Sequence, residues 1–101
     1  MWMIVLFDLP VTSKQARKQA SDFRKSLLDN GFQMSQYSVY FRLVPGREVV
    51  ETYVGKIRKS LPKAGKVDIV CITDRQYEDI ISFTGKVLGG KHKNPTQLAL
   101  F

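Results

Sequence analysis

The residues best suited to chemistry are an aspartate at the end of an apolar run and the basic residues that follow it. Trp2–Phe7 is continuously apolar, Asp8 comes next, and Pro10 prevents further strand pairing. Such a run predicts a central strand that is buried on both faces. Asp8 would then stand at the carboxyl end of a rigid strand, where open α/β sheets place functional groups. The alternative is that Asp8 only caps the following turn, as aspartate often does.

The stretch after this strand predicts a helix over Val11–Asn30. Thr12 would be its N-cap, Gln15 would complete a capping box, and Asn30-Gly31 would stop the helix. Apolar residues at spacings of three and four form one face that must pack on the sheet, namely Ala16, Ala20, Phe23 and Leu27.

Basic residues of this helix are candidates for nucleic-acid binding. They gather on an arc beside the apolar face: Lys14, Arg17, Lys18, Arg24 and Lys25. A basic arc is often only a solvated face. However, the chain has 16 Lys and Arg against 9 Asp and Glu, a net charge of +7 and a pI near 9.8. This balance favours a polyanionic partner, and nucleic acid is the first candidate.

A second β region is expected over Phe32–Val44. Its alternation assigns one set of residues to the core face, namely Tyr37, Val39, Phe41 and Leu43. The other face would carry Ser38, Tyr40 and Arg42, whose polar groups suit hydrogen bonds to phosphate. A solvated strand face would look the same. Since no Gly or Pro marks a turn before Tyr37, the region is either one bulged strand or two strands.

The rest of the chain predicts a second helix and further strands. The helix should cover Glu48–Leu61 and end at Pro62. Its buried side would carry Val49, Val50, Tyr53, Val54, Ile57 and Leu61. Gly55 would mark a close approach of the helix to the sheet. Val67–Thr73 should be another buried strand, and Ile80–Phe83 a short additional one.

These elements predict an α+β fold, the ferredoxin-like βαββαβ sandwich with an extra C-terminal strand. Residues 1–84 would form this domain, and 85–101 a flexible basic linker with an apolar tail. The apolar tail, Gln97–Phe101, is expected to pair with a sheet edge of another protomer or partner. Many functions share this fold, so the fold alone decides none of them.

Several classes of protein and site are disfavoured. The sequence has no P-loop, dinucleotide-binding, zinc-protease or nucleophile-elbow motif. No apolar stretch approaches transmembrane length and no signal sequence is apparent, so we expect a cytoplasmic protein without a membrane partner. The single cysteine, Cys71, should be a small buried hydrophobe. His92, the only histidine, is expected to be a solvated loop residue, because structural zinc needs four ligands.

The residues also carry a resemblance to a known family. The F-D-L-P sequence that ends the first strand, the basic pair Arg17-Lys18 and the G-F-Q-M-S-Q-Y-S-V-Y block of Gly31–Tyr40 are similar to those of the small CRISPR-associated endoribonuclease family, Cas protein two. The similarity spans the whole chain. Leu9-Pro10 directly after the aspartate, and Arg17-Lys18 in place of paired arginines, resemble the branch found beside single-effector CRISPR systems.

The resemblance implies a homodimer that partners the CRISPR integrase during spacer acquisition. It also implies a Mg²⁺-dependent endonuclease of RNA or double-stranded DNA, with Asp8 as metal ligand and catalytic residue, or a scaffold that binds the nucleic acid without cleaving it. Because no second acidic residue lies near Asp8 in the predicted strand or helix, a metal would have to be shared by two copies of Asp8 across a dimer axis. The alternative class is a ferredoxin-like RNA-binding or regulatory module without catalysis. An RNA-recognition motif would show an aromatic-rich signature string that this sequence lacks.

Overall fold

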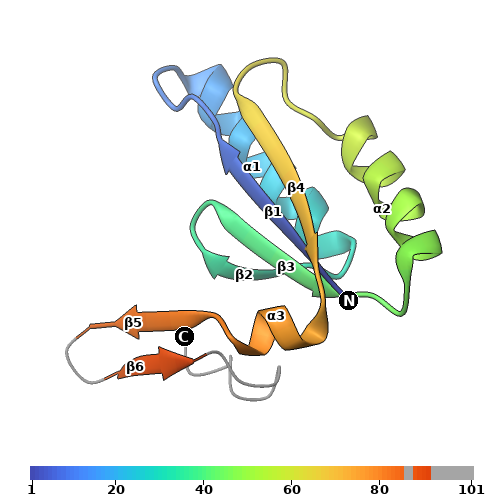
Figure 1. Ribbon diagram of the computed structural model, residues 1–101. Helices are drawn as coiled ribbons and strands as arrows, with labels where there is room; N and C mark the ends of the chain where they lie inside the picture. The colour runs from blue at the N-terminus through green and yellow to red at the C-terminus, as the bar shows by residue number, and fades with distance from the viewer. Residues whose placement is uncertain (86–87, 92–101) are drawn as a thin grey trace.

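A four-stranded antiparallel sheet with β1 in its interior organises the molecule (Figure 1). The computed structural model describes residues 1–85 and 88–91. The elements are β1 (Trp2–Asp8), α1 (Lys14–Asp29), β2 (Gln33–Gln36), β3 (Val39–Leu43), α2 (Arg47–Lys59), β4 (Lys66–Ile72), α3 (Asp74–Glu78), β5 (Ile81–Thr84) and β6 (Leu88–Lys91). The strand order is β2-β3-β1-β4, and β5 and β6 form a separate two-stranded sheet. The predicted α+β, ferredoxin-like fold with an extra strand is confirmed.

Strand β1 is central, as predicted, but it is not buried evenly on both faces. Met3, Val5 and Phe7 lie in the main core with residues of α1 and α2. On the other face, which we call the open face, Leu6 is 37% exposed and Asp8 is exposed. Only the start of β1 is covered there, because Trp2 stacks on Tyr77 of α3 with ring centroids 4.0 Å apart. The apolar run therefore predicted the strand but not its uncovered second face.

The two long helices, α1 and α2, begin and end close to the predicted positions, with one different cap, whereas the short helix α3 was not predicted. The N-cap of α1 is Ser13, whose hydroxyl accepts from the Ala16 backbone N–H at 3.0 Å, so the prediction of Thr12 was wrong. Helix α2 ends at Lys59, and Leu61, predicted to be buried, is 46% exposed. Gly55 does not lie close to the sheet as expected, because a Cβ built on it would meet no atom within 4 Å.

The second β region is a hairpin of two strands rather than one bulged strand. Tyr37 and Ser38 form its turn, and the register shifts between Met34 and Gln36. Within β3 the predicted alternation holds, since Val39, Phe41 and Leu43 share one face, but the face expected to be polar is the one that meets the main core. Tyr40 lies in the main core, whereas Phe41 lies on the open face with Trp2 and Tyr77. Both faces of β3 carry apolar residues, so the alternation alone did not show which face meets the main core.

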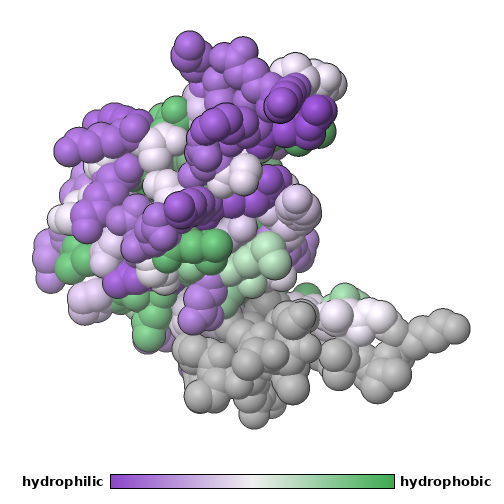
Figure 2. Space-filling view, turned by 180° about the vertical axis from the view of Figure 1, so that it is seen from behind, coloured by the Kyte–Doolittle hydropathy of each residue, from purple (hydrophilic) through white to green (hydrophobic). Residues whose placement is uncertain are grey.

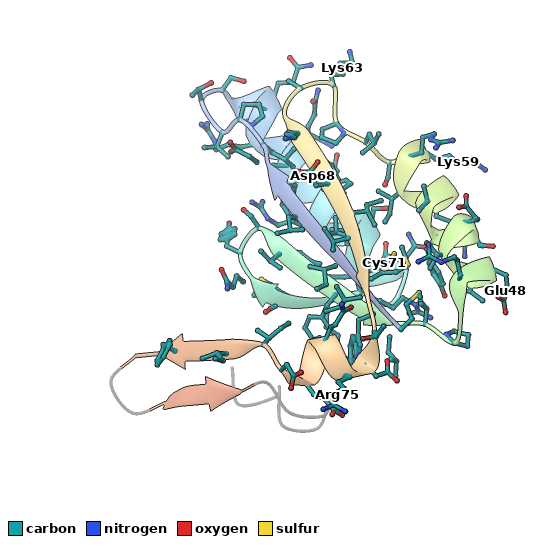
Figure 3. The ribbon with its side chains drawn as sticks, in the orientation of Figure 1. Glu48, Lys59, Lys63, Asp68, Cys71 and Arg75 are labelled. Carbon is teal, nitrogen blue, oxygen red and sulfur yellow. The ribbon has the colours of Figure 1, made fainter. Side chains whose placement is uncertain are left out.

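The last strands differ from expectation in burial and partners. β4 is an edge strand with an alternating pattern, and its Asp68 and Val70 are exposed rather than buried. β5 was predicted, but it pairs with β6, which occupies part of the segment expected to be a flexible linker. Cys71 is half-buried beside the main core (Figure 3). The apolar tail Gln97–Phe101 and His92 lie outside the described residues.

Candidate functional site

A pocket of about 640 Å³ opens at the carboxyl end of β1, and it brings together part of the predicted site. Asp8 and Leu9 from the end of β1 line it, and so do Arg17, Ser21 and Arg24 of α1 and the turn residues Tyr37 and Ser38. A backbone hydrogen bond from the Phe7 N–H to the Ser38 carbonyl, 3.0 Å, holds the turn beside the strand. Three separate elements therefore place a carboxylate, two serine hydroxyls, a phenol and two guanidinium groups around one space.

Asp8 is exposed, and its carboxylate has no hydrogen-bond or ion-pair partner among the described residues. Its main chain is confined by the loop before β4, where Gly65 has a φ of +100°. A Cβ at Gly65 would lie 2.6 Å from the Asp8 carbonyl oxygen. The loop is tied to α1 because the Lys63 backbone N–H donates to Gln19 Oε1 at 3.3 Å; Figure 3 marks Lys63 at the top of this loop. A free carboxylate therefore stands on a firmly positioned backbone.

The basic residues of α1 divide into two groups. Arg17 lines the pocket and donates from Nη1 to the Val11 carbonyl at 3.1 Å, which orients the guanidinium and leaves other N–H groups free. Lys14, Lys18 and Lys25 are exposed and follow one stripe at spacings of four and seven residues. Lys18 pairs with Asp22 at 2.9 Å, an exposed pair that contributes about 0.3–0.5 kcal/mol and breaks easily. The face that bears α1 is largely hydrophilic (Figure 2).

Arg24 does not point its charge freely into solvent. Its guanidinium carbon lies 4.2 Å from the centroid of the Tyr37 ring and 5.7 Å from that of Phe7. Its Nε also donates to the Tyr37 carbonyl at 3.4 Å. Burial raises the pKa of the neighbouring Tyr40 phenol; Arg24 opposes this rise and Tyr37 adds to it, so Tyr40 is neutral at physiological pH. Through its contacts with Phe7 and Tyr37, Arg24 connects the Tyr37–Ser38 turn to β1.

Arg42, predicted beside the phosphate-binding groups, lies at the other end of the hairpin. Its guanidinium is half-buried over the Tyr53 ring at 4.4 Å, and Nη1 donates to the Asn30 carbonyl at 3.1 Å. The Arg42 side chain packs directly against Gly31, where a Cβ would collide with Nη1 of Arg42. The structure does not bring Arg42 together with Asp8, and these contacts give its side chain a packing role.

One acidic neighbour was missed by sequence reasoning. In the β1–β4 register Asp8 lies opposite Lys66 and Leu6 lies opposite Asp68, so Asp8 and Asp68 share the open face as diagonal neighbours. Asp68 pairs with Lys66 at 3.6 Å. The strand order would have indicated this neighbour, but a sequence with several apolar strands does not reveal which two are adjacent. Asp74 is farther along the chain and binds the N-terminal amine at 2.7 Å.

The donor set around Asp8 fits Mg²⁺ only in a water-rich form. Carboxylate, hydroxyl and carbonyl oxygens are the ligands that Mg²⁺ prefers, and protein-bound Mg²⁺ often has one or two carboxylates with water and phosphate oxygens. Within residues 1–85 and 88–91, no group of three or more His, Cys, Asp or Glu side chains is placed to hold a metal ion. Among the described residues that line the pocket, Asp8 is the one carboxylate, and it fits such an ion when substrate or a second chain completes the coordination.

The open face of the sheet carries a second hollow, of about 670 Å³, between β1, β3 and the β5 strand. Ile4, Val39, Phe41 and Phe83 contribute to its lining. Apolar side chains on and around this face remain strongly exposed: Leu43 is 50%, Val70 43%, Ile81 63% and Phe83 84% exposed. Large apolar side chains that stay exposed on one side of a folded domain are typical of an interaction surface.

Fold and site define a class: a small ferredoxin-like domain with a free aspartate at the end of its first strand and a basic first helix beside it. The family model described as CRISPR associated protein Cas2 matches residues 1–80, and the chain belongs to this family. It is 50% identical over 101 residues to the CRISPR-associated endoribonuclease Cas2 of Paracidovorax avenae, covering 100% of this chain and 94% of that protein. Proteins of the same name from Flavobacterium psychrophilum and Parvibaculum lavamentivorans are 45% and 42% identical, covering 100% of this chain and 88% and 100% of those proteins.

The family assignment confirms the resemblance drawn from the residues. For the described part of the chain, none of the helices combines the length and apolar character needed to cross a bilayer.

Proposed function

We propose that this chain is a homodimeric nucleic-acid-binding subunit of CRISPR spacer acquisition, a partner of the integrase, and that Asp8 gives it Mg²⁺-dependent endonuclease activity on RNA or double-stranded DNA. The observation that carries the nuclease assignment is the free Asp8 carboxylate, which shares one pocket with Arg17 and Ser38. The relatives of this chain are named endoribonucleases, and this name supports an activity on phosphodiester bonds. We expect the protein to act in the cytoplasm.

Each pocket residue has a role that follows from its chemistry. Arg17 offers charged N–H donors to the non-bridging oxygens of a phosphate, and Ser38 offers a hydroxyl to the same group. Asp8 is the candidate ligand for Mg²⁺, which when bound would stabilise the negative charge of the reacting phosphate. Lys14, Lys18 and Lys25 would contact neighbouring phosphates without selecting sequence.

A dimer accounts for the single carboxylate and for the apolar open face. A second copy on the open face would remove exposed side chains such as Phe83 from water, and each mostly exposed large apolar side chain contributes about 1.5–3 kcal/mol when fully buried. A two-fold axis near the carboxyl ends of the two β1 strands would bring two copies of Asp8 together. Two facing carboxylates repel each other unless a cation lies between them.

The test compares three variants in a cleavage assay with single-stranded RNA and duplex DNA, with Mg²⁺ and with EDTA. Asp8→Asn keeps the shape of the side chain but removes its charge, so it should abolish Mg²⁺-dependent cleavage and leave dimerisation and duplex binding intact. Phe83→Asp should yield monomers in sedimentation and lose cleavage although Asp8 remains. Asp29→Asn, an equal change in charge at an exposed site on α1, is the control and should cleave like wild type.

The outcomes separate the alternatives. Cleavage by Asp8→Asn at the wild-type rate would falsify the catalytic assignment. If the wild type does not cleave but captures the integrase and binds duplex DNA, the protein is a scaffold. If it neither cleaves nor captures the integrase, the module without catalysis is favoured.

A further inference from the structure

The exposed aromatic ring at the mouth of the pocket has no role in the chemistry assigned to Asp8. Tyr37 is 67% exposed, although it lines the same pocket as Asp8 and Arg17. An exposed tyrosine in a turn is usually mobile, but this one is held by two contacts from a single side chain. Arg24 stacks on the ring at 4.2 Å and donates to the Tyr37 carbonyl at 3.4 Å.

The support beneath Tyr37 is itself rigid. Arg24 is half-buried and extends from α1 between the rings of Phe7 and Tyr37. Phe7 is 6% exposed and packs edge-on against Phe23 in the main core, with ring centroids 5.2 Å apart. Phe7 also precedes Asp8 directly on β1. The stack of Phe7, Arg24 and Tyr37 therefore fixes the Tyr37 ring relative to the strand that carries the carboxylate.

From this arrangement we propose that Tyr37 is a stacking platform for an unpaired nucleobase, and that Arg24 is its positioning residue. One ring face is covered by the guanidinium, and the largely exposed ring has surface left for a flat ligand. Aromatic faces of this kind bind bases of single strands regardless of sequence. The pocket would hold the adjoining phosphate near Arg17 and the base on Tyr37.

The proposal narrows the substrate class of the proposed nuclease, and it rests on that function for the role of Asp8. Bases inside a duplex are stacked on their own neighbours and offer no free face to a side chain. The site therefore requires a nucleotide that is unpaired at this position, in a single strand, an overhang or a frayed end. The lysine stripe on α1 contacts backbone phosphates and does not share this requirement.

The experiment measures binding in EDTA, so that no cleavage occurs and a failure of the nuclease assignment does not affect it. A single-stranded oligonucleotide containing 2-aminopurine, and a duplex of equal length, are titrated with wild type, Tyr37→Ala and Tyr37→Phe. Tyr37→Ala should weaken single-strand binding about 5- to 100-fold and relieve the quenching of 2-aminopurine, with duplex affinity within about twofold of wild type. Tyr37→Phe should bind like wild type, because the ring is retained.

Two further variants sharpen the result. Arg24→Lys keeps the charge but loses the planar stack, so it should weaken single-strand binding and restore part of the 2-aminopurine fluorescence. Met34→Ala alters another exposed apolar residue of the same hairpin, 57% exposed, outside the pocket, and should change nothing. Equal losses of single-strand and duplex binding by Tyr37→Ala, or no loss of single-strand binding, would overturn the proposal.

Discussion

The most direct perturbation of the candidate site is a single methyl group behind Asp8, in the variant Gly65→Ala. Gly65 has a φ of +100°, and a Cβ there would lie 2.6 Å from the Asp8 carbonyl oxygen and 2.8 Å from Cδ2 of Leu9. Real Cβ atoms do not approach backbone oxygens this closely, so either the loop or the end of β1 must move. The loop cannot retreat freely because Lys63 is bonded to Gln19 of α1.

The magnitude follows from two contributions. A left-handed conformation costs a residue with a Cβ about 1–2 kcal/mol relative to glycine. Forcing an extra carbon into a packed site typically adds about 1–3 kcal/mol. Together they predict a loss of about 2–5 kcal/mol in the free energy of unfolding. Gly55→Ala is the matched control, because the added methyl meets no atom within 4 Å and a helical alanine is favoured over glycine by about 0.5–1 kcal/mol.

Urea denaturation followed by the fluorescence of Trp2, the only tryptophan, measures both variants. The Gly55→Ala midpoint should rise and the Gly65→Ala midpoint should fall. Folded Gly65→Ala, assayed at low temperature without urea, should also cleave more slowly than wild type because Asp8 is displaced. If Gly65→Ala is as stable as wild type, the close approach to Asp8 is not a constraint and the reasoning fails.

The first strand and its aspartate were predictable because their signals are local. A continuous apolar run followed by proline describes a strand that ends at Asp8, and the structure has β1 at Trp2–Asp8. The two long helices, α1 and α2, were predictable for the same reason, since apolar spacing and glycine or proline signals lie within each segment. These local signals do not indicate which other elements cover each face of a strand. The open face of β1 depends on where the two large helices pack.

The hairpin shows how a local ambiguity becomes a wrong assignment of faces. Val39, Phe41 and Leu43 do share one face of β3, but apolar side chains occur on both faces, and the alternation assigned the core to the wrong one. Tyr40 was therefore expected on the polar face, and it is only 2% exposed in the main core. Its phenol is a poor candidate for phosphate binding.

Partners within the site were the least predictable feature, because they depend on contacts between distant segments. Arg24 and Arg42 are ordinary basic residues in the sequence, yet each lies over an aromatic ring, Tyr37 and Tyr53 respectively. The tyrosines stand 13 and 11 positions away from these arginines and belong to different elements, so no period within one helix or strand relates them. A basic residue near an aromatic one is too common in sequences to indicate such a pair.

Two further predictions concern the basic surface and the packing of α3. Replacing Lys14, Lys18 and Lys25 by alanine should reduce the slope of log affinity against log salt on duplex DNA by about 0.9 for each lost phosphate contact. The control, Arg42→Ala, should lower stability and leave this slope unchanged. An unchanged slope in the triple variant would mean that these three lysines form only a solvated face. Tyr77 is 3% exposed, and burial raises its pKa from 10.0 to about 12. Since the unfolded chain loses this phenolic proton near pH 10 and the folded chain keeps it until about pH 12, the associated stability is present below pH 10 and is lost as the pH rises towards 12. A shift of this size corresponds to about 2–3 kcal/mol. Urea midpoints measured between pH 9 and 12 should therefore fall more for wild type than for Tyr77→Phe, which has no proton to lose, and parallel curves for the two proteins would show that the Tyr77 phenol ionises as readily in the folded state as in the unfolded one.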